Sequence, residues 1–409
     1  MRTPPSRRAA AAAAPPPNPG GTRVRTNLQR GDIIIAALSP RVRFVDHLLL
    51  RVICRAWRRS CRLIGRAPPP FPWLMLPPPA AGAGPAPAPG APERRVFYDI
   101  PGGRSYAYPV PTSYRYVASR HGWLVLAAAD PPRRLVVLNP ITTARVDVPW
   151  PFGEDPTEGF HAVLTASLAD PAACFLAVAT DRLIKYCRVG FGAGGVGNWL
   201  TLRATGFRYD TACSDLVSVG TTVYLTDKRR KLWRADLAAA EPKVERRDTS
   251  FALPQPQGEI RWRHHLVESL GHVLLVVSDD HHRRLGLYRL NWDAKVWVRM
   301  PASGLSDSVL LLGRGCSAAV PASAAAGRSP GTVLVVRQPW RSTVLHAGLN
   351  FCGGGGGGEQ PWFWTESRIG AGLDDDQLVM RKTVPQRPGV FKTGDSFWFF
   401  PAIDQSDCP

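Results

Sequence analysis

The sequence predicts a mainly β protein: a six- to seven-bladed β-propeller preceded by a small all-α module. Three observations predict this fold. Gly and Pro account for 38 and 40 of the 409 residues, a content typical of a turn-rich β protein and not of a bundle of long helices. Short apolar runs bounded by turn residues recur after residue 120 at a spacing typical of propeller blades. A twelve-residue hairpin pattern also occurs twice.

The first 66 residues differ in composition and predicted secondary structure from the remainder. Residues 1–26 contain mostly Ala, Pro, Gly and Arg, which offer little to bury, so we expect a disordered tail. Residues 27–66 predict a helical domain: Asp32 is a plausible N-cap of a short apolar helix, and apolar residues recur at helical spacing through 44–63. A module this small makes a weak core alone, which favours a partner.

Residues 67–405 predict the propeller, interrupted at 77–92 by a Pro/Ala/Gly-rich insertion or linker. Five apolar runs begin near residues 123, 174, 222, 273 and 309, with steps of 51, 48, 51 and 36 residues. Four-stranded blades repeat about every 40–50 residues. The complete set of predicted strand runs is 123–126, 135–138, 174–178, 222–225, 273–277, 309–312, 333–336 and 397–400, with a first strand expected within 71–76.

The repeated hairpin is LNPITTARVDVP at 138–149 and LNWDAKVWVRMP at 290–301. Both copies begin with Leu-Asn, place Val seven residues after the Asn and end in Pro, so both predict strand, tight turn, strand. They therefore indicate equivalent hairpins of two blades. A non-repeating β-sandwich or a pair of β domains is the alternative.

The net charge of +19 is unevenly distributed, with +12 in residues 1–66 and +7 in the other 343. We interpret the Arg excess as a solvated tail and surface, and a specific nucleic-acid partner is not expected. No apolar run approaches the roughly 18 residues of a membrane-spanning helix, so a soluble chain with no membrane partner is expected.

Cysteine usage and the N-terminus bear on the compartment. The eight Cys contain no CxxC pair, which leaves a structural zinc site unsupported. Without an apolar secretory segment we expect free buried thiols and a reducing compartment, nucleus and/or cytoplasm. The Arg-bearing, acid-poor leader weakly resembles a transit peptide, so organelle import is the alternative.

Several motifs resemble ligand sites by letter only. Residues 190–195 fit GxGxxG, with Asp215 downstream, but a strand-like segment follows where a dinucleotide site needs a helix. The hexaglycine 353–358 likewise precedes no helix. Both are interpreted as loops.

Polar clusters give no metal or catalytic prediction. The adjacent pairs 264–265 and 281–282 are His-His, and neighbours on a strand point to opposite faces. Asp279-Asp280 and the three Asp of 374–376 are interpreted as solvated turns. Glu268 is the polar residue expected to be buried, in a hydrogen bond within its blade and not in catalysis.

Residues 28–62 resemble an F-box. The resemblance rests on RVICRAWR at 51–58, which matches the helix that ends such modules, while the opening has Gln29 where the family has Pro and one extra residue before Asp32. The resemblance implies a Skp-type adaptor as partner and, through it, a cullin. The implied adaptor-binding residues are Leu28, Asp32, Ile33, Ile34, Leu38, Leu49, Val52, Cys54 and Trp57. Packing within the helices alone is the alternative for Cys54 and Trp57.

The remainder resembles the C-terminal β-propeller of plant F-box proteins, the domain-of-unknown-function-295 family. The matching blocks are SRHGWLVL at 119–126, LNPIT at 138–142, HLVESLGHVLLVV at 265–277, DSVLLLG at 307–313 and WFFP at 398–401. Together the two resemblances cover nearly all of the chain after residue 27.

The resemblances imply a substrate-receptor subunit of a Skp–cullin–F-box ubiquitin ligase. In this role the helices bind the adaptor and the propeller binds a target protein that the sequence does not identify. We expect no enzymatic activity, cofactor or metal. The alternative is a non-catalytic propeller interaction protein with a lapsed F-box, for which location in an organelle is left open.

Overall fold

The computed structural model divides the chain into two compact units, residues 1–68 and 69–409. The structure describes part of the second unit: residues 72–76, 92–99, 104–128, 131–153, 160–180, 183–191, 195–202, 213–227, 231–247, 262–279, 285–300, 302–305, 307–313, 315–324, 331–336, 364–369, 378–383 and 397–399. The predicted tail and helical module lie outside these residues.

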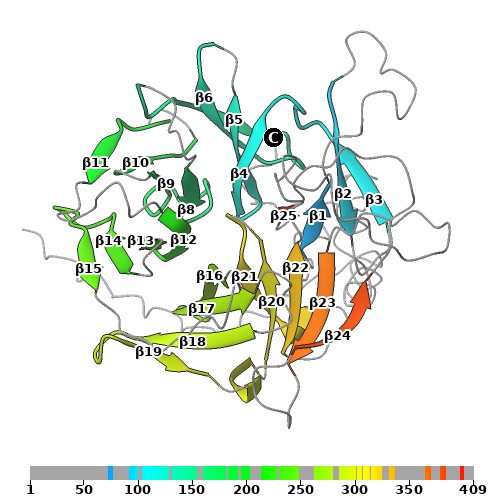
Figure 1. Ribbon diagram of the computed structural model, residues 1–409. Helices are drawn as coiled ribbons and strands as arrows, with labels where there is room; N and C mark the ends of the chain where they lie inside the picture. Colours follow the sequence, from blue (N-terminus) through cyan, green and yellow to red (C-terminus); the bar gives the residue numbers. More distant parts are fainter. Residues whose placement is uncertain are drawn as a thin grey trace, which may run out of the picture. The chain divides into compact units, whose positions relative to one another are not determined.

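The second unit is a six-bladed β-propeller (Figure 1). Blade 1 has the strand order β25-β1-β2-β3 and joins both ends of the unit. Its strands are β25 (Phe397–Phe399), β1 (Trp73–Met75), β2 (Arg95–Asp99) and β3 (Arg104–Tyr108).

Blades 2 to 5 are antiparallel meanders of four consecutive strands. Blade 2 contains β4 (Arg115–Arg120), β5 (Trp123–Ala128), β6 (Arg134–Leu138) and β7 (Arg145–Pro149). Blade 3 contains β8 (His161–Leu164), β9 (Phe175–Ala179), β10 (Ile184–Arg188) and β11 (Leu200–Leu202). Blade 4 contains β12 (Cys213–Val219), β13 (Thr222–Asp227), β14 (Leu232–Asp236) and β15 (Glu245–Arg247). Blade 5 contains β16 (Trp262–Ser269), β17 (His272–Asp279), β18 (Leu285–Asn291) and β19 (Val296–Arg299).

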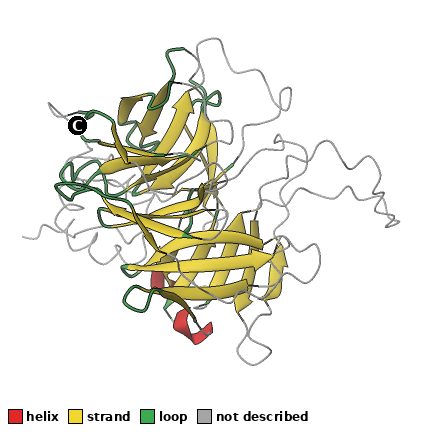
Figure 2. Cartoon of the chain, turned by 60° about the vertical axis from the view of Figure 1, so that its left-hand side comes forward, coloured by secondary structure: helices red, strands yellow, loops and turns green. Residues whose placement is uncertain are grey.

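Blade 6 is irregular, because its order is β21-β20-β22-β23-β24 and β20 pairs with β22 in parallel. Its strands are β20 (Ser308–Leu312), β21 (Ala318–Pro321), β22 (Thr332–Val336), β23 (Trp364–Ile369) and β24 (Leu378–Thr383). The 3-10 helices η1 (Ala302–Leu305) and η2 (Ala322–Ala324) are the only helices among the described residues (Figure 2). None of the described residues forms a helix long and apolar enough to cross a membrane.

The predicted 50-residue spacing is the spacing of the second strands. The runs near 123, 174, 222, 273 and 309 form β5, β9, β13, β17 and β20, each second in its blade. A second strand packs against a neighbouring blade on each face, so all six residues of β5 are buried. The run near 397 departs from this rule, because it forms the inner strand of blade 1.

The predicted equivalence of the two LN hairpins is confirmed. They join the third and fourth strands of blades 2 and 5, with Asn139 and Asn291 at the start of the turns. Asn139 Oδ1 accepts from the Ile141 amide at 3.0 Å, and Asn291 Oδ1 accepts from the Ala294 amide at 3.0 Å. The Asn side chain therefore fixes each turn locally.

The core lies between neighbouring blades as separate apolar clusters. One joins blades 2 and 3 around Trp123, the next joins blades 3 and 4 around Trp233, and others join blades 4 to 5 and 5 to 6. Blade 1 is closed by Trp73, which pairs with Phe399 across β1 and β25, with ring centroids 6.2 Å apart. The buried aromatic contact fastens the two ends of the propeller.

Candidate functional site

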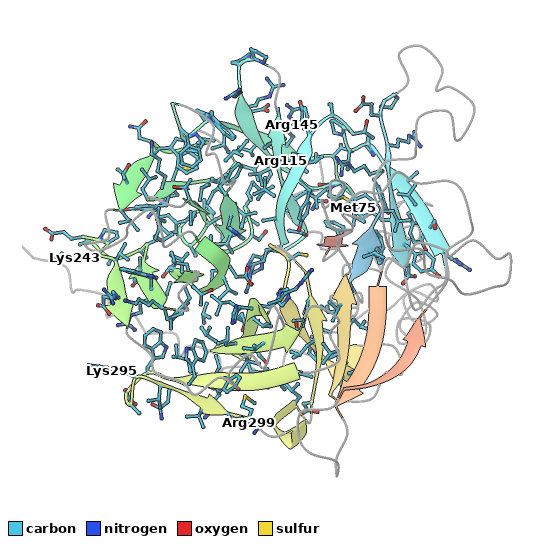
Figure 3. The ribbon with its side chains drawn as sticks, in the orientation of Figure 1. Met75, Arg115, Arg145, Lys243, Lys295 and Arg299 are labelled. Carbon is cyan, nitrogen blue, oxygen red and sulfur yellow. The ribbon has the colours of Figure 1, made fainter. Side chains whose placement is uncertain are left out.

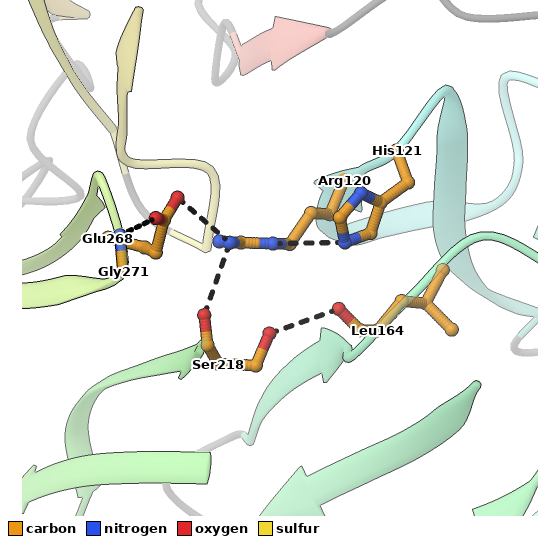
Figure 4. A network of polar contacts seen from close by, with 6 residues as sticks. All are labelled: Arg120, His121, Leu164, Ser218, Glu268 and Gly271. Atoms are coloured by element: carbon orange, nitrogen blue, oxygen red, sulfur yellow. Dashed lines mark hydrogen bonds and ion pairs between the residues drawn. The ribbon is translucent and has the colours of Figure 1, made fainter. Parts of the chain in front are cut away.

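None of the nine residues expected to bind an adaptor lies among the described residues, because all of them fall within 1–68. The candidate site in the described propeller is a polar bridge across the inner strands β4, β8, β12 and β16. These strands contact one another in that order, as each begins its blade. We call it the Arg120 bridge, formed by Arg120, His121, Leu164, Ser218, Glu268 and Gly271 (Figure 4).

Arg120 is the last residue of β4 and reaches the inner strands of two other blades. Its Nη2 donates to the Ser218 carbonyl in blade 4 at 3.1 Å and lies 3.5 Å from Glu268 Oε2 in blade 5. Its Nε donates to His121 Nε2 at 3.3 Å. One guanidinium therefore uses its fixed fork of donors to join three blades.

Glu268 is oriented by its own turn. Its Oε1 accepts from the Gly271 amide at 2.9 Å, while Oε2 faces Arg120. The expectation that Glu268 is buried is wrong, since its side chain is only partly buried, with 28% exposed. Its position three residues before Gly271 leaves the carboxylate at the end of the strand, where it reaches the turn amide and solvent. The expected hydrogen bond is present.

Two further contacts tie blade 4 to its neighbours. Ser218 Oγ donates to the Leu164 carbonyl of blade 3 at 3.2 Å. Buried Asp215 accepts from the Leu266 amide of blade 5 at 2.7 Å. Asp215, which a dinucleotide site would have placed on ribose, therefore joins two inner strands.

The protonation states in the bridge follow from burial. Burial, then the positive charge of Arg120, lowers the pKa of His121 to about 4, although a backbone hydrogen bond to Thr165 opposes this. Burial also lowers the pKa of Arg120, partly offset by Glu268. At neutral pH His121 is therefore neutral and its Nε2 accepts a hydrogen bond from Arg120 Nε, while Arg120 keeps its charge.

Gly315 and Ser317, which lie between β20 and β21 of blade 6, contact the bridge strands. The Ser119 amide of β4 donates to the Gly315 carbonyl at 3.2 Å, and Ser317 Oγ lies 3.4 Å from His265 Nδ1 of β16. Gly315 has a φ of 66°, and a Cβ there would lie 2.4 Å from the Val117 carbonyl oxygen. Only glycine permits this approach.

Two of the described thiols, Cys174 and Cys187, are not activated. Cys174, Cys187 and Cys316 are buried and form no disulfide, as expected. Burial raises the pKa of Cys174 and of Cys187 to about 12, so neither is a thiolate nucleophile at neutral pH. Within the described ranges, no three His, Cys, Asp or Glu side chains are grouped to hold a metal ion.

The sequence motifs that resembled ligand sites by letter only are located as follows. Gly190 donates its amide to the Gly195 carbonyl in a loop that leads to β11, so a strand follows, as predicted. His264 and His265 are neighbours on β16. Asp280, the pair 281–282, the hexaglycine 353–358 and the acidic run 374–376 lie outside the described residues.

The end of the propeller that carries the first turns, which we call the first-turn face, also presents apolar side chains. Leu270, in the first turn of blade 5, is 80% exposed with a φ of 51°. Phe191, at the third turn of blade 3, is 41% exposed and lies 5.4 Å from Trp123 between ring centroids. First and third turns lie at one end of an antiparallel blade. Sequence reasoning missed Leu270, although its place before Gly271 in a two-residue turn is a local signal.

Basic side chains lie at the periphery. Lys243, Lys295 and Arg299 are exposed, and Figure 3 shows them projecting outward from blades 4 and 5. Lys243 lies 3.5 Å from Glu241 in an ion pair exposed on both sides. These described charges are solvated.

Residues 97–347 match the family described as KIB1-4 β-propeller. The chain belongs to this family. The match begins in blade 1 and extends beyond β22 of blade 6, so it includes the whole Arg120 bridge. No curated protein matches the sequence significantly.

The solved structures that resemble part of this fold have low sequence identity to this chain. A candidate 6-phosphogluconolactonase from Bacteroides uniformis is 10% identical with a TM-score of 0.39, covering 77% of this chain and 83% of that one. TolB from Acinetobacter baumannii is 14% identical with a TM-score of 0.32, covering 56% and 51%. The WD40 domain of SCAP from fission yeast is 8% identical with a TM-score of 0.28, covering 51% and 48%. Likenesses this weak contribute nothing to the assignment of function.

Proposed function

We propose that the protein is a substrate receptor of a Skp–cullin–F-box ubiquitin ligase. The observation that carries the proposal is a KIB1-4 β-propeller over 97–347 downstream of a segment, 28–62, that resembles an F-box. The helical segment binds a Skp-type adaptor and through it a cullin. The propeller binds the target protein.

The proposed mechanism is proximity and involves no chemistry by this chain. Holding a target on the same assembly as a ubiquitin-charged enzyme raises its effective concentration there. The pKa values of His121, Cys174 and Cys187 are all shifted away from neutrality in the direction that removes acid, base or nucleophile function.

The first-turn face is the target-binding surface in this proposal. Leu270 is an apolar side chain in a two-residue turn, and exposed apolar groups of this kind act as anchors in interfaces. Glu268 holds the same turn through the Gly271 amide, and Arg120 holds Glu268. A surface that is already ordered loses less entropy when a partner binds.

The adaptor half of the proposal is tested by reconstitution with purified Skp-type adaptor. Val52→Asp or Trp57→Ala is expected to abolish co-purification with the adaptor, because a charge or void at an anchor of a small apolar interface costs several kcal/mol, on the order of 2–4. Leu270→Asp is the matched control and should keep the adaptor.

A gain-of-binding variant addresses the opening of the F-box-like segment. Replacing Gln29 by Pro and deleting Gly31 restores the Leu-Pro-x-Asp order of the family and is expected to strengthen adaptor binding. Failure of both the wild type and this variant to bind any adaptor isoform would contradict the receptor role. The lapsed F-box alternative would then be adopted.

The target half is tested separately by comparing the proteins retained by two propeller variants. Leu270→Asp is expected to lose partners that Val298→Asp retains, because Val298 is an exposed apolar residue, 48% accessible, on the outer strand β19. Equal retention by both variants would remove the first-turn face as the binding surface, whatever the adaptor result.

A further inference from the structure

A pocket of about 460 Å³ lies between blades 1 and 2, away from the Arg120 bridge. Its volume falls within the range of small-molecule sites, roughly 300–1,000 Å³. The wall from blade 2 includes the buried side chains Val136 and Leu138, and the approach to β4 contributes Tyr114. The complete lining is Pro92, Glu93, Pro109, Pro111, Tyr114, Val136, Leu138, Thr143 and Arg145.

The lining is mostly apolar and rigid. Three prolines, one valine and one leucine supply much of the surface, and a proline ring has a fixed φ and almost no side-chain freedom to lose. A pocket of this kind binds an apolar body at a low entropic cost.

The polar groups at the pocket carry a surplus positive charge. Arg134 and Arg145 share a single carboxylate, with Arg134 Nε at 3.2 Å and Arg145 Nη2 at 2.7 Å from Asp147 Oδ1. Arg134 also donates to Tyr114 Oη at 3.2 Å, and the Arg145 guanidinium lies 6.0 Å from the Tyr114 ring centroid. Two cations and one carboxylate leave one positive charge beside the Tyr114 ring.

The acidic residue of the lining is already engaged. Glu93 Oε2 accepts from the backbone amides of Thr112 and Ser113, and these contacts lower the pKa of Glu93. Buried Arg95, whose Nη2 donates to the Tyr114 carbonyl, balances its charge. Glu93 and Arg95 therefore form a neutral set, and the surplus at Arg134 and Arg145 is not cancelled.

The pKa of the Tyr114 phenol is affected by the positive charges of Arg134 and Arg145. Its pKa is lowered, first by the hydrogen bond from Arg134 and then by the hydrogen bond and charge of Arg145. A lowered phenol pKa means that negative charge is favoured at this point of the pocket.

We propose that the pocket between blades 1 and 2 binds a small amphipathic monoanion, with a planar or aliphatic apolar body against Val136, Leu138 and the prolines and a carboxylate against Arg145. Arg145 Nε and Nη2 already donate to the two oxygens of Asp147, and the other edge of the planar guanidinium carries the N–H donors that match a ligand carboxylate. An aromatic body gains a contact with Tyr114 as well. Because blade 1 holds both ends of the propeller, a ligand here adds contacts at the joint that closes the ring.

The experiment uses the full chain and three naphthalenes of similar shape as probes. Isothermal titration calorimetry compares 1-naphthoate, neutral 1-naphthalenemethanol and cationic 1-naphthylmethylammonium. The expected order of affinity is anion, neutral, cation, with the anion about tenfold tighter than the neutral compound. 1-Naphthoate should also raise the thermal midpoint, since a ligand that binds only the folded state stabilises it.

Two variants change the charge in opposite directions. Arg145→Met removes the surplus while keeping an unbranched stem, and is expected to bring the affinity for 1-naphthoate down to that for the neutral compound. Asp147→Asn raises the surplus and is expected to tighten 1-naphthoate several-fold. Arg234→Met is the matched control, because Arg234 also pairs with a carboxylate, Glu245 at 2.9 Å, and lies over an aromatic ring, but in blade 4.

Each outcome decides the proposal. Anion preference that Arg145→Met removes, that Asp147→Asn increases and that Arg234→Met leaves intact supports it. Equal affinity for the three probes, no binding up to about 1 mM, or equal losses in Arg145→Met and Arg234→Met overturns it. Thermal melts of all variants confirm that each is folded.

Discussion

The first turns of blades 2 and 5 have similar backbone φ angles but differ in whether the side chain at the first turn position is bonded within the fold or exposed to solvent. His121 and Gly122 have φ angles of 52° and 85°, and Leu270 and Gly271 have 51° and 77°. In blade 2 the residue at the first of these positions accepts a hydrogen bond from Arg120. In blade 5 it is a leucine that is 80% exposed. The turn geometry therefore does not decide the role of the turn.

The difference indicates that the blade 2 turn contributes to the stability of the fold, whereas the blade 5 turn exposes a side chain to solvent. A left-handed conformation costs a non-glycine residue about 1–2 kcal/mol. The His121 contact with Arg120 compensates for it within the fold, whereas an exposed Leu270 recovers little by burial. Glu268 links the two turns, since it faces Arg120 with one oxygen and accepts from the Gly271 amide with the other. We infer that Arg120 of blade 2, acting through Glu268, fixes the conformation of the blade 5 turn that exposes Leu270.

Breaking the link is expected to have the largest effect. Arg120→Met removes the donor to the Ser218 carbonyl and leaves Glu268 with a half-buried, uncompensated charge. We expect a loss of about 2–3 kcal/mol in the free energy of unfolding, measured by urea denaturation.

The control for this variant is an exposed ion pair of similar composition. Arg234→Met removes the partner of Glu245, and these side chains are 33% and 47% exposed. Its cost should stay below about 1 kcal/mol. An equal cost for the two variants would mean that the Arg120 bridge contributes no more than a surface pair.

The pH dependence of stability should also distinguish the turns. His121 has a folded-state pKa of about 4 against an ordinary value of 6.5, so between these values the unfolded chain binds more protons. The contribution of His121 to the free energy of unfolding is then fully present above about pH 6.5 and is lost as the pH falls toward 4. The shift sets an upper limit of about 3 kcal/mol, and nearby solvent reduces the expected loss to about 1–2.

His121→Asn is the variant that tests this assignment. Asn tolerates the left-handed conformation and does not titrate, so the decline between pH 6.5 and 4 should become shallower by the contribution of His121. An unchanged pH profile would mean that the imidazole is solvated in the folded protein.

A smaller effect is expected at the glycine of the blade 5 turn. Gly271 has a φ of 77° and open space where a Cβ would stand, so Gly271→Ala introduces backbone strain without a clash. We expect a loss of about 1 kcal/mol. A loss above about 3 kcal/mol by thermal or urea unfolding would show that Glu268 and Arg120 had moved with the turn.

Local signals account for the part of the fold that the sequence predicted. The second strands β5, β9, β13 and β17 are apolar runs between turn residues, and the LN hairpins carry their own Asn-based turns. Such patterns act within about ten residues, and sequence reasoning therefore detects them. The predicted range of six to seven blades includes the six observed.

Pairing over long separations has no such local signal. The contact between β25 and β1 joins opposite ends of the propeller, and the parallel pairing of β20 with β22 joins strands that are separated in the chain by β21. The Arg120 bridge is of the same kind: Glu268 was singled out, but its partner is 148 residues away. Arg120 is the last residue of β4 and Glu268 the penultimate residue of β16, each just before a turn that contains a Gly, which in retrospect was the available signal.

The smallest expected effect has the opposite sign. Leu270→Asn places a residue that tolerates positive φ in the blade 5 turn and gives up little burial, because Leu270 is 80% exposed. We expect a gain of about 0.5–1 kcal/mol in the free energy of unfolding. If the first-turn face binds the target, the same variant should weaken target binding, so stability and binding would move in opposite directions. A variant that loses stability, or that gains stability and binds the target as well as the wild type, would contradict the assignment of Leu270 as the presented residue.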